Sequence, residues 1–389
     1  MNKKEVKKAP TLRFKGFTND WEQRKLKDCL EINSGRDYKH LHSGNIPVFG
    51  TGGYMLSVDE ALSYKNAIGI GRKGTIDKPQ LLIAPFWTVD TLFFLTPEND
   101  TDLYFLFSFF QKVNWKKYDE STGLPSLSKK TISTIKIKTP SKNEQIKIGT
   151  LIQKVNNLIS LQQRKLDILI KLNRNIIINL FKEIRVNHHA IELKHTASNW
   201  KSARLKELGI CQSGFGFPIK EQNGSKGIPF FKVSDFNTFG NEIYLQYANN
   251  YVTNHQIRKN KWKIFDQVPA IVFAKVGAAI FLNRKRMINE PFLIDNNLMA
   301  FELNRQKLDY KFAKILFDNM YLPKFAQVGA LPSYNASDIN AIKVKIPDMD
   351  SQKKIANIIM KNNNEIILQK QILQKGKELK QFLLQNMFI

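Results

Sequence analysis

Two segments of the chain carry apolar residues at alternating steps of four and three positions, the spacing of a coiled-coil seam. Residues 143–183 place Ile148, Ile152, Val155, Ile159, Gln162, Leu166, Leu169, Ile176 and Leu180 on this series. Residues 350–389 place Ile355, Ile359, Ile366, Gln369, Leu373, Leu383 and Met387 on a second, weaker series, which Asn362, Gly376 and Lys380 interrupt. The pattern predicts two long helices of about 57 Å each, from a rise of about 1.5 Å for each of about 38 residues.

Each predicted helix begins just after a proline, with Ser141 or Ser351 as a possible N-cap. Gln162 and Gln369 occupy the same position of the two seams. One interpretation is a buried polar pair that fixes the register of the helices. The other is two glutamines at the wet edge of the seam.

The remaining segments, 20–142 and 199–349, mix short apolar runs with Gly and Pro turns and a few helical stretches. Leu81–Phe86 and Ala270–Phe273 are predicted as strands, and Leu103–Gln111 and Tyr310–Asn319 as helices. Both segments are therefore predicted to be globular domains of mixed α and β structure, preceded by a basic segment at residues 1–19.

The chain also repeats itself. Residues 124–126 (Leu-Pro-Ser) recur at 331–333, and the shift of 207 residues then stays constant to the end of the chain. Earlier matches have shorter shifts: residues 21–26 answer 200–205, and Ser34-Gly35 answers Ser213-Gly214. The matched ends enclose middles of different length and sequence, which indicates one scaffold that carries two different surfaces.

The order of the segments constrains their connection. The first helix leads through a linker at 184–198 into the second domain, so the second helix has to run back along the first. The predicted fold is mixed α/β: two globular domains separated by an antiparallel pair of long coiled-coil helices, with a pseudo-two-fold internal repeat.

The charge points to a polyanionic partner. Residues 1–190 contain 31 Lys and Arg against 18 Asp and Glu, and residues 191–389 contain 29 against 16. Each part therefore has a net charge of +13, and no single basic tail accounts for the total of +26. RNA, an anionic membrane, DNA and a merely solubilising basic surface all fit the charge alone.

The cysteine content and the hydropathy of the chain indicate its cellular compartment. The chain has only Cys29 and Cys211, outside any spacing typical of a disulfide framework or a zinc finger. No apolar segment has the length of a signal peptide core or a membrane span. We expect a cytoplasmic protein with no membrane partner, and no metal at the His188-His189 pair, which has no companion ligands.

Several motifs, in this order and partly twice, resemble those of type I restriction-modification specificity subunits over essentially the whole chain. They are residues 12–26, which end in Trp-Glu-Gln-Arg-Lys-Leu, Gly-Thr-Gly-Gly at 50–53, Ile-Gly-Arg-Lys-Gly-Thr at 70–75, Gly-Leu-Pro-Ser at 123–126 with its echo at 330–333, and the Pro-to-Gln-x-x-Ile helix openings. The second domain departs from the pattern, because Phe273–Gly277 lacks the Arg of the first loop and Phe231–Val233 replaces the Gly-rich turn.

The resemblance implies two target recognition domains that bind double-stranded DNA, two methyltransferase (M) subunits and, for cleavage, restriction (R) subunits. It also implies that this chain holds no cofactor and that S-adenosylmethionine, ATP and Mg²⁺ belong to the partner subunits. Because the middles differ, we expect a bipartite, asymmetric target with unread base pairs between its halves.

Arg, Lys, Asn and Gln in the variable middles are the residue types that contact phosphates and base edges. The candidate DNA contacts are Arg36, Lys39, Arg72, Lys73, Lys116 and Lys117 in the first domain and Lys220, Lys232, Lys259, Lys261, Lys263, Arg284, Lys285 and Arg286 in the second. Arg72-Lys73 stands out because the flanking glycines let the backbone approach a phosphate. Gly224–Gly227 forms a similar loop, of a composition that ordinary turns also have.

Two other classes of function remain open. Gly69–Thr75 nearly spells a phosphate-binding loop, but Thr75 stands where the lysine is needed. Asp348 with Glu378 and Lys380 could serve metal-assisted hydrolysis. A self-contained nuclease or methyltransferase is thus one alternative, although no catalytic residues are assigned, and a nonspecific nucleic-acid-binding coiled-coil scaffold is the other.

Overall fold

The computed structural model describes residues 9–182, 200–327 and 331–389. The chain divides into two compact units: Met1–Asp167 with Ile367–Ile389, and Ile168–Ile366. Each unit contains one globular head and a stretch of both long helices. The linker expected at 184–198, with its two histidines, lies outside the described residues. None of the described helices combines the length and apolar composition needed to cross a membrane.

Head 1, the globular part of the first unit, runs from Glu22 to Thr139. Its strands are β1 (Glu22–Lys25), β2 (Leu30–Ser34), β3 (Ser43–Gly50), β4 (Gly53–Val58), β5 (Ala67–Gly71), β6 (Gln80–Leu82), β7 (Trp87–Thr88), β8 (Leu92–Pro97) and β9 (Lys136–Thr139). Its helices are η1 (Leu26–Asp28), α1 (Leu103–Lys112), η2 (Trp115–Tyr118) and α2 (Lys129–Thr134). The strands form sheets of order β2-β8-β5-β6, β4-β3-β7 and β1-β9.

Head 2, the globular part of the second unit, runs from Lys201 to Ile346. Its strands are β10 (Lys201–Arg204), β11 (Gly209–Ser213), β12 (Ile228–Phe231), β13 (Tyr251–Val252), β14 (Ala270–Ala274), β15 (Lys285–Ile288), β16 (Leu293–Ile294), β17 (Leu298–Leu303) and β18 (Lys343–Ile346). Its helices are α4 (Leu205–Leu208), η3 (Ile219–Glu221), η4 (Val233–Asn237), α5 (Asn254–Asn260), η5 (Ala278–Leu282), α6 (Tyr310–Asn319), η6 (Leu322–Phe325) and α7 (Ala336–Asn340).

The two heads share one topology. The sheets of head 2 have the order β11-β17-β14-β15, β13-β12-β16 and β10-β18, which repeats head 1 strand for strand. From α1 and α6 onward the elements are 207 residues apart, so the constant register begins earlier than the sequence match shows. Head 2 adds η3, η4, α5 and η5 between the shared strands. The prediction of one scaffold with unlike middles is confirmed.

Repeated residues hold the scaffold together. The side chain of Gln145 accepts a hydrogen bond from the Asp102 amide at 3.0 Å, and Asp102 in turn caps α1 by accepting from the Phe105 amide at 2.8 Å. In head 2, Gln352 does the same for Asp309, which caps α6. Because both glutamines are buried, their amides tie the start of each long helix to its head.

The repeated Ser-Gly pairs have a steric reason. A Cβ on Gly35 would lie 2.0 Å from the Val89 carbonyl oxygen, and one on Gly214 would lie 2.1 Å from the Asp295 carbonyl oxygen. The backbones after β2 and β11 therefore approach the turns after β7 and β16 too closely for any side chain.

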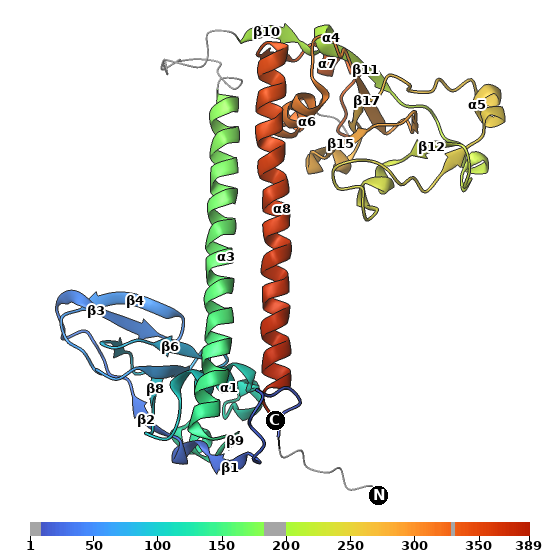
Figure 1. Cartoon of the computed structure of the whole chain (residues 1–389). Helices are drawn as coiled ribbons and strands as arrows, with labels where there is room; N and C mark the ends of the chain where they lie inside the picture. Colours follow the sequence, from blue (N-terminus) through green and yellow to red (C-terminus); the bar gives the residue numbers. More distant parts are fainter. Residues whose placement is uncertain (1–8, 183–199, 328–330) are drawn as a thin grey trace, which may run out of the picture. The chain divides into compact units, whose positions relative to one another are not determined.

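The helices α3 (Lys142–Lys182) and α8 (Met349–Asn386) lie beside each other within each unit (Figure 1). In the first unit the side chain of Gln369 donates to Gln162, and Ile159 lies against Gly376. In the second unit the side-chain amide of Asn173 donates to Asn363 at 2.8 Å. Residue numbers fall along one helix as they rise along the other, so the pair is antiparallel, as predicted.

The four-three series is the buried side of these helices. Every predicted seam residue is buried or half-buried, including Ile152 and Ile359 at 0 % and 1 % exposure. Leu383 and Met387, at the end of α8, also join the core of head 1. Ile176 and Leu180 likewise pack against the core of head 2. The seam therefore continues into both heads.

Two local predictions were wrong. Ser351 is not an N-cap, because α8 begins earlier and Asp348 accepts hydrogen bonds from both the amide and the hydroxyl of Ser351 at 2.9 Å. These hydrogen bonds lower the pKa of the Asp348 carboxyl. The strand predicted over Leu81–Phe86 ends at Leu82, and the Ala84 amide donates to the Asn66 side chain at 2.9 Å instead of to a neighbouring strand.

Candidate nucleic-acid interface

The loop Arg72–Gly74 follows the buried strand β5 of head 1. The Arg72 amide donates to the Thr91 carbonyl at 2.7 Å, and the Gly74 amide donates to the Pro125 carbonyl at 2.8 Å. Gly74 has a φ of +89°, which favours glycine. These contacts fix the backbone while the side chains of Arg72 and Lys73 remain exposed.

A groove of about 370 Å³ opens beside this loop. Its lining is Ser34, Arg72, Lys73, Phe93, Ser126, Leu127, Ser128 and Lys129. The Arg72 guanidinium lies 5.9 Å from the centre of the Phe93 ring, at the outer limit of a cation–π contact. Cations and hydroxyl donors without a carboxylate make this lining suitable for a phosphate or another anion.

Head 2 builds the same loop from different residues. After β14, the Lys275 amide donates to the Asn297 carbonyl at 2.9 Å, and the Gly277 amide donates to the Pro332 carbonyl at 2.8 Å. Gly277 has a φ of +76°. Lys275 therefore occupies the place of Arg72, and its ammonium donates to the Ser213 hydroxyl at 3.0 Å.

Sequence comparison missed Lys275 because it took the absent arginine as a departure from the pattern. The signal was nevertheless in the chain, since the Leu-Pro-Ser repeat bonds the backbone of this loop in both heads, and the serine of each Ser-Gly pair lies beside the cation of the loop. The two loops therefore correspond in their backbone hydrogen bonds, although their side chains differ.

The other candidates of head 1 lie on the surface. Arg36, Lys39, Lys116 and Lys117 are exposed, and the Lys116 ammonium lies 3.2 Å from the Asp77 carboxylate. An ion pair this exposed contributes little to stability. These side chains are therefore free to reorient toward a partner.

Most candidates of head 2 cluster near α5, a helix that head 1 lacks. Lys220, Lys259, Lys261 and Lys263 are exposed, with Lys259 3.2 Å from the buried carboxylate of Glu221. The ammonium of the half-buried Lys232 donates to Gln222 at 3.0 Å. The extra elements of head 2 thus carry its own set of cations.

Lys285 does not fit the proposed role. It is 2 % exposed, and its ammonium donates to the Asn283 side chain at 2.7 Å and the Met320 carbonyl at 2.6 Å. Burial lowers its pKa to about 8. Because that ammonium is inside the head, Lys285 is not a DNA contact. Its half-buried neighbours Arg284 and Arg286 bond Asn237 and the Asn241 carbonyl at 2.6 Å each.

The glycines of the 224–227 loop have structural reasons. A Cβ on Gly224 would lie 2.1 Å from the Tyr251 carbonyl oxygen, and Gly227 has a φ of +110°. The turn beside β12 therefore accounts for both residues, and Lys226 is an exposed cation on it.

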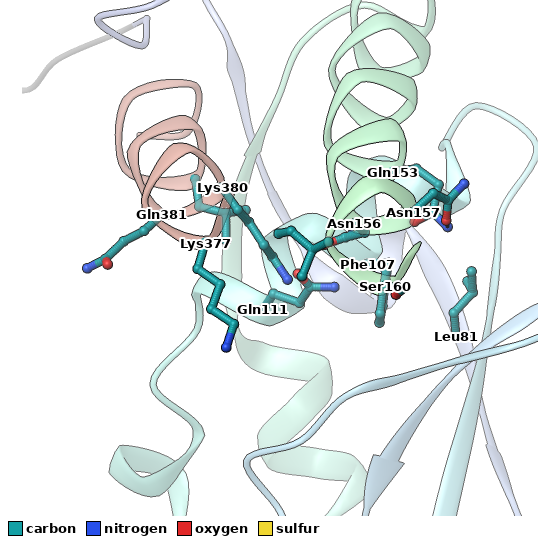
Figure 2. A pocket seen from close by; sticks show the side chains of 12 residues that line it. Leu81, Phe107, Gln111, Gln153, Asn156, Asn157, Ser160, Lys377, Lys380 and Gln381 are labelled. Atoms are coloured by element: carbon teal, nitrogen blue, oxygen red, sulfur yellow. The ribbon is translucent and has the colours of Figure 1, made fainter. Parts of the chain in front are cut away.

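A second cavity, of about 560 Å³, lies between α1, α3 and α8 in the first unit. Figure 2 shows Lys380, Gln111 and Asn156 directed into it. Burial lowers the pKa of Lys380, and the Gln111 side-chain oxygen is buried without a hydrogen-bond partner. By the 207-residue shift, Gly376 and Lys380 replace the Leu169 and Asn173 of the first helix, so this end of the seam is less filled.

The lining of that cavity contains no carboxylate, thiol or imidazole, and its ionisable side chains are those of Lys377 and Lys380. The near-match to a phosphate-binding loop is also explained, since Gly69–Gly71 lie within β5 and no helix follows Gly74. Asp348 caps α8, and Glu378 accepts from Gln374 on the same helix. Within residues 9–182, 200–327 and 331–389, no three His, Cys, Asp or Glu gather at a metal-binding distance.

Comparison with known proteins agrees with this arrangement. The family model of the type I restriction modification DNA specificity domain matches residues 18–171 and 197–377. The MjaVIII specificity subunit of a type I restriction enzyme from Methanocaldococcus jannaschii is 25 % identical over 71 % of this chain and 68 % of its own. The MjaIX specificity subunit from the same organism is 22 % identical over 91 % and 89 %.

A solved structure shows the same fold. The crystal structure of the type I restriction-modification S subunit from M. genitalium covers 98 % of this chain and 99 % of its own, with a TM-score of 0.64 and 15 % identity.

A duplicated α/β head, a shared helix pair and basic loops in both heads define the class of two-headed DNA-recognition subunits. Within that class, the chain belongs to the type I restriction-modification DNA specificity family, whose model matches both of its heads. It is a specificity subunit.

Proposed function

We propose that this chain reads a bipartite, asymmetric DNA sequence, one half with each head, and presents it to the other subunits of a type I complex. The observation that carries the proposal is that one scaffold occurs twice with unlike connections between its strands. A duplicated scaffold binds the same kind of ligand twice. Unlike connections give each copy a different preference.

The distribution of cations supports this division of labour. Head 2 carries Lys259 and Lys261 on α5 and just after it, and head 1 has no corresponding helix. Head 1 instead presents Arg36 and Lys39 in the connection between β2 and β3. Contacts to base edges determine the sequence that is read, whereas contacts to phosphates only position the protein on the DNA. Different surfaces on one scaffold therefore favour different half-sites.

The long helices are the proposed docking surface for two methyltransferase subunits. Both helices leave apolar residues exposed at equivalent positions: Leu161 and Leu368 are 59 % and 50 % exposed, and Leu172 and Leu379 are 49 % exposed each. Exposed apolar residues outside the seam favour a protein partner. Their repetition at a shift of 207 residues suits two copies of the same partner.

Catalysis is proposed to belong to the partners, and so are S-adenosylmethionine, ATP and Mg²⁺. Restriction subunits would join the same complex for cleavage. In this scheme the chain contributes recognition and positioning only.

A head exchange tests the proposal. Residues 20–140 are replaced by the corresponding head of another specificity subunit, and the chain is produced with its methyltransferase partner. Single-molecule sequencing of the methylated host DNA should then show a change in one half of the motif only. The reciprocal exchange of residues 199–347 is the matched control and should change the other half.

A change in both halves after one exchange contradicts the division between the heads. Turnover on DNA by the purified chain, with magnesium and S-adenosylmethionine but no partner, would instead support a self-contained enzyme. Binding of every polyanion with the same affinity would support a nonspecific scaffold.

A further inference from the structure

The two heads are expected to read different sequences, so a surface feature that both heads share has to contact something common to both half-sites. The loop after β5 and the loop after β14 are such a feature. Residues Lys73 and Ser126 form an antiparallel bridge in head 1, and Val276 and Ser333 form the same bridge in head 2. The surrounding strand connections differ, yet this contact is kept.

Three side-chain properties are common to both loops. A cation stands directly after the buried strand, as Arg72 or as the residue that replaces it, Lys275. The serine before the Gly of each Ser-Gly pair lies beside that cation: Ser34 lines the same groove as Arg72, and Ser213 accepts from the Lys275 ammonium at 3.0 Å. A leucine completes the set.

The leucines are unusual for their exposure. Leu124 is 67 % exposed and Leu331 is 60 % exposed, although both belong to segments that the protein holds in place by backbone bonds to the cationic loop. In head 2, the Leu331 Cδ1 lies only 3.6 Å from the position of a Cβ on Gly277, so leucine and loop form one surface. An apolar side chain kept at the surface twice indicates a partner that covers it.

We propose that this shared surface is a sequence-independent DNA anchor, present once in each head, and this inference rests on the proposed function. Arg72 or Lys275, with the neighbouring serine hydroxyl, binds one backbone phosphate. Leu124 or Leu331 packs against the adjacent deoxyribose. This contact then places the segments that differ between the two heads beside the base edges that they read.

The presence of Arg72 in one head and of Lys275 in the other fits a phosphate as the common acceptor. Arginine binds a phosphate through its planar fork of donors, and lysine binds one as a point charge. The other cations of the head 1 groove support an anionic partner, because Lys73 and Lys129 also line it.

Binding measurements on the chain in complex with its methyltransferase subunits test the anchor. Affinities for a duplex with the target motif and for one without it are measured over a salt series for Arg72→Ala, Lys275→Ala and the double variant. Each single substitution should weaken both affinities by about tenfold, as expected for a lost bond to a charged group. The slope of log K against log salt should become shallower by about 0.9 for each lost phosphate contact.

The leucine variants separate the apolar part of the anchor from the charge. Leu124→Ser and Leu331→Ser should also weaken the affinity for both duplexes by about tenfold, the factor that corresponds to burying a leucine side chain. Their salt slopes should equal that of the wild type. Lys27→Ala and Lys206→Ala are the matched controls, because these lysines are exposed and equivalent in the two heads but lie on η1 and α4. Both controls should bind like the wild type.

Three results would overturn the anchor: an unchanged salt slope in the double variant, a changed ratio between the two duplexes, or equal losses in the lysine controls. Loss of methyltransferase subunits from the leucine variants in gel filtration would assign the surface to that protein instead. Failure of the proposed function looks different, because then the wild-type complex itself would show no preference for a split sequence.

Discussion

The glutamine pair of the helix seam allows a quantitative test of its role. Gln369 is 1 % exposed, and its side-chain amide donates to the side chain of Gln162 and, at 3.3 Å, to the Gln162 backbone carbonyl. Leu166 and Leu373, which lie one seam position away on either helix, are both 6 % exposed. The wet-edge interpretation therefore fails for Gln369, while a role in fixing the register stays a prediction.

Replacement by leucine should be asymmetric. Gln162→Leu removes the main acceptor of a buried amide, a loss that costs about 1–3 kcal/mol, and the remaining 3.3 Å bond favours the lower end. Gln369→Leu should cost less, because the half-buried Gln162 left behind can bond water. The double variant should be as stable as the wild type or more stable, since no buried polar group is then unpaired.

Hydrogen exchange read by mass spectrometry measures this locally in the intact chain. In Gln162→Leu, peptides that cover residues 158–166 and 366–373 should lose protection equivalent to about 1–3 kcal/mol, towards the lower end of that range. They should regain this protection in the double variant. Gln371→Leu is the matched control, because that glutamine is exposed on the same helix. Unchanged protection in Gln162→Leu, or additive losses in the double variant, would refute the argument.

Four further predictions concern the heads and the helices. Gly214→Ala should destabilise head 2 by more than about 1 kcal/mol in urea unfolding, because its Cβ would collide with the Asp295 carbonyl oxygen, and wild-type stability would disprove the close approach. The lowered pKa of Lys285 means that folding opposes its protonation. The free energy of unfolding of the wild type relative to Lys285→Met should therefore rise between about pH 8 and the ordinary lysine pKa. If denaturant titrations give a difference between the two proteins that does not change with pH, the burial is contradicted. Leu161→Glu with Leu368→Glu should prevent co-purification of methyltransferase subunits without unfolding the chain, and intact complexes would exclude this surface. Adding seven residues at matched places in both helices should change the number of unread base pairs, whereas an unaltered gap in the methylated motif would reject the helices as the spacer.

The sequence by itself determined the duplication and the helix pair. Apolar residues at steps of four and three predict a helix that pairs with another helix, because only one face of a helix can be buried against a single partner. The matching ends of the heads were readable for a similar reason. Gln145 and Gln352, like Gly35 and Gly214, each make the same contact in both heads, so the same residue recurs at both positions.

Only the tertiary structure decided which residues of the middles correspond and which are accessible. Lys275 takes the place of Arg72 through backbone contacts with segments more than twenty residues away in the chain, and no letter-by-letter match reports such contacts. Lys285 looked like a surface cation between two arginines, yet a strand directs alternate side chains to opposite faces, and its own face is the buried one. Local residue preferences fix the elements, while long-range packing fixes what each side chain can reach.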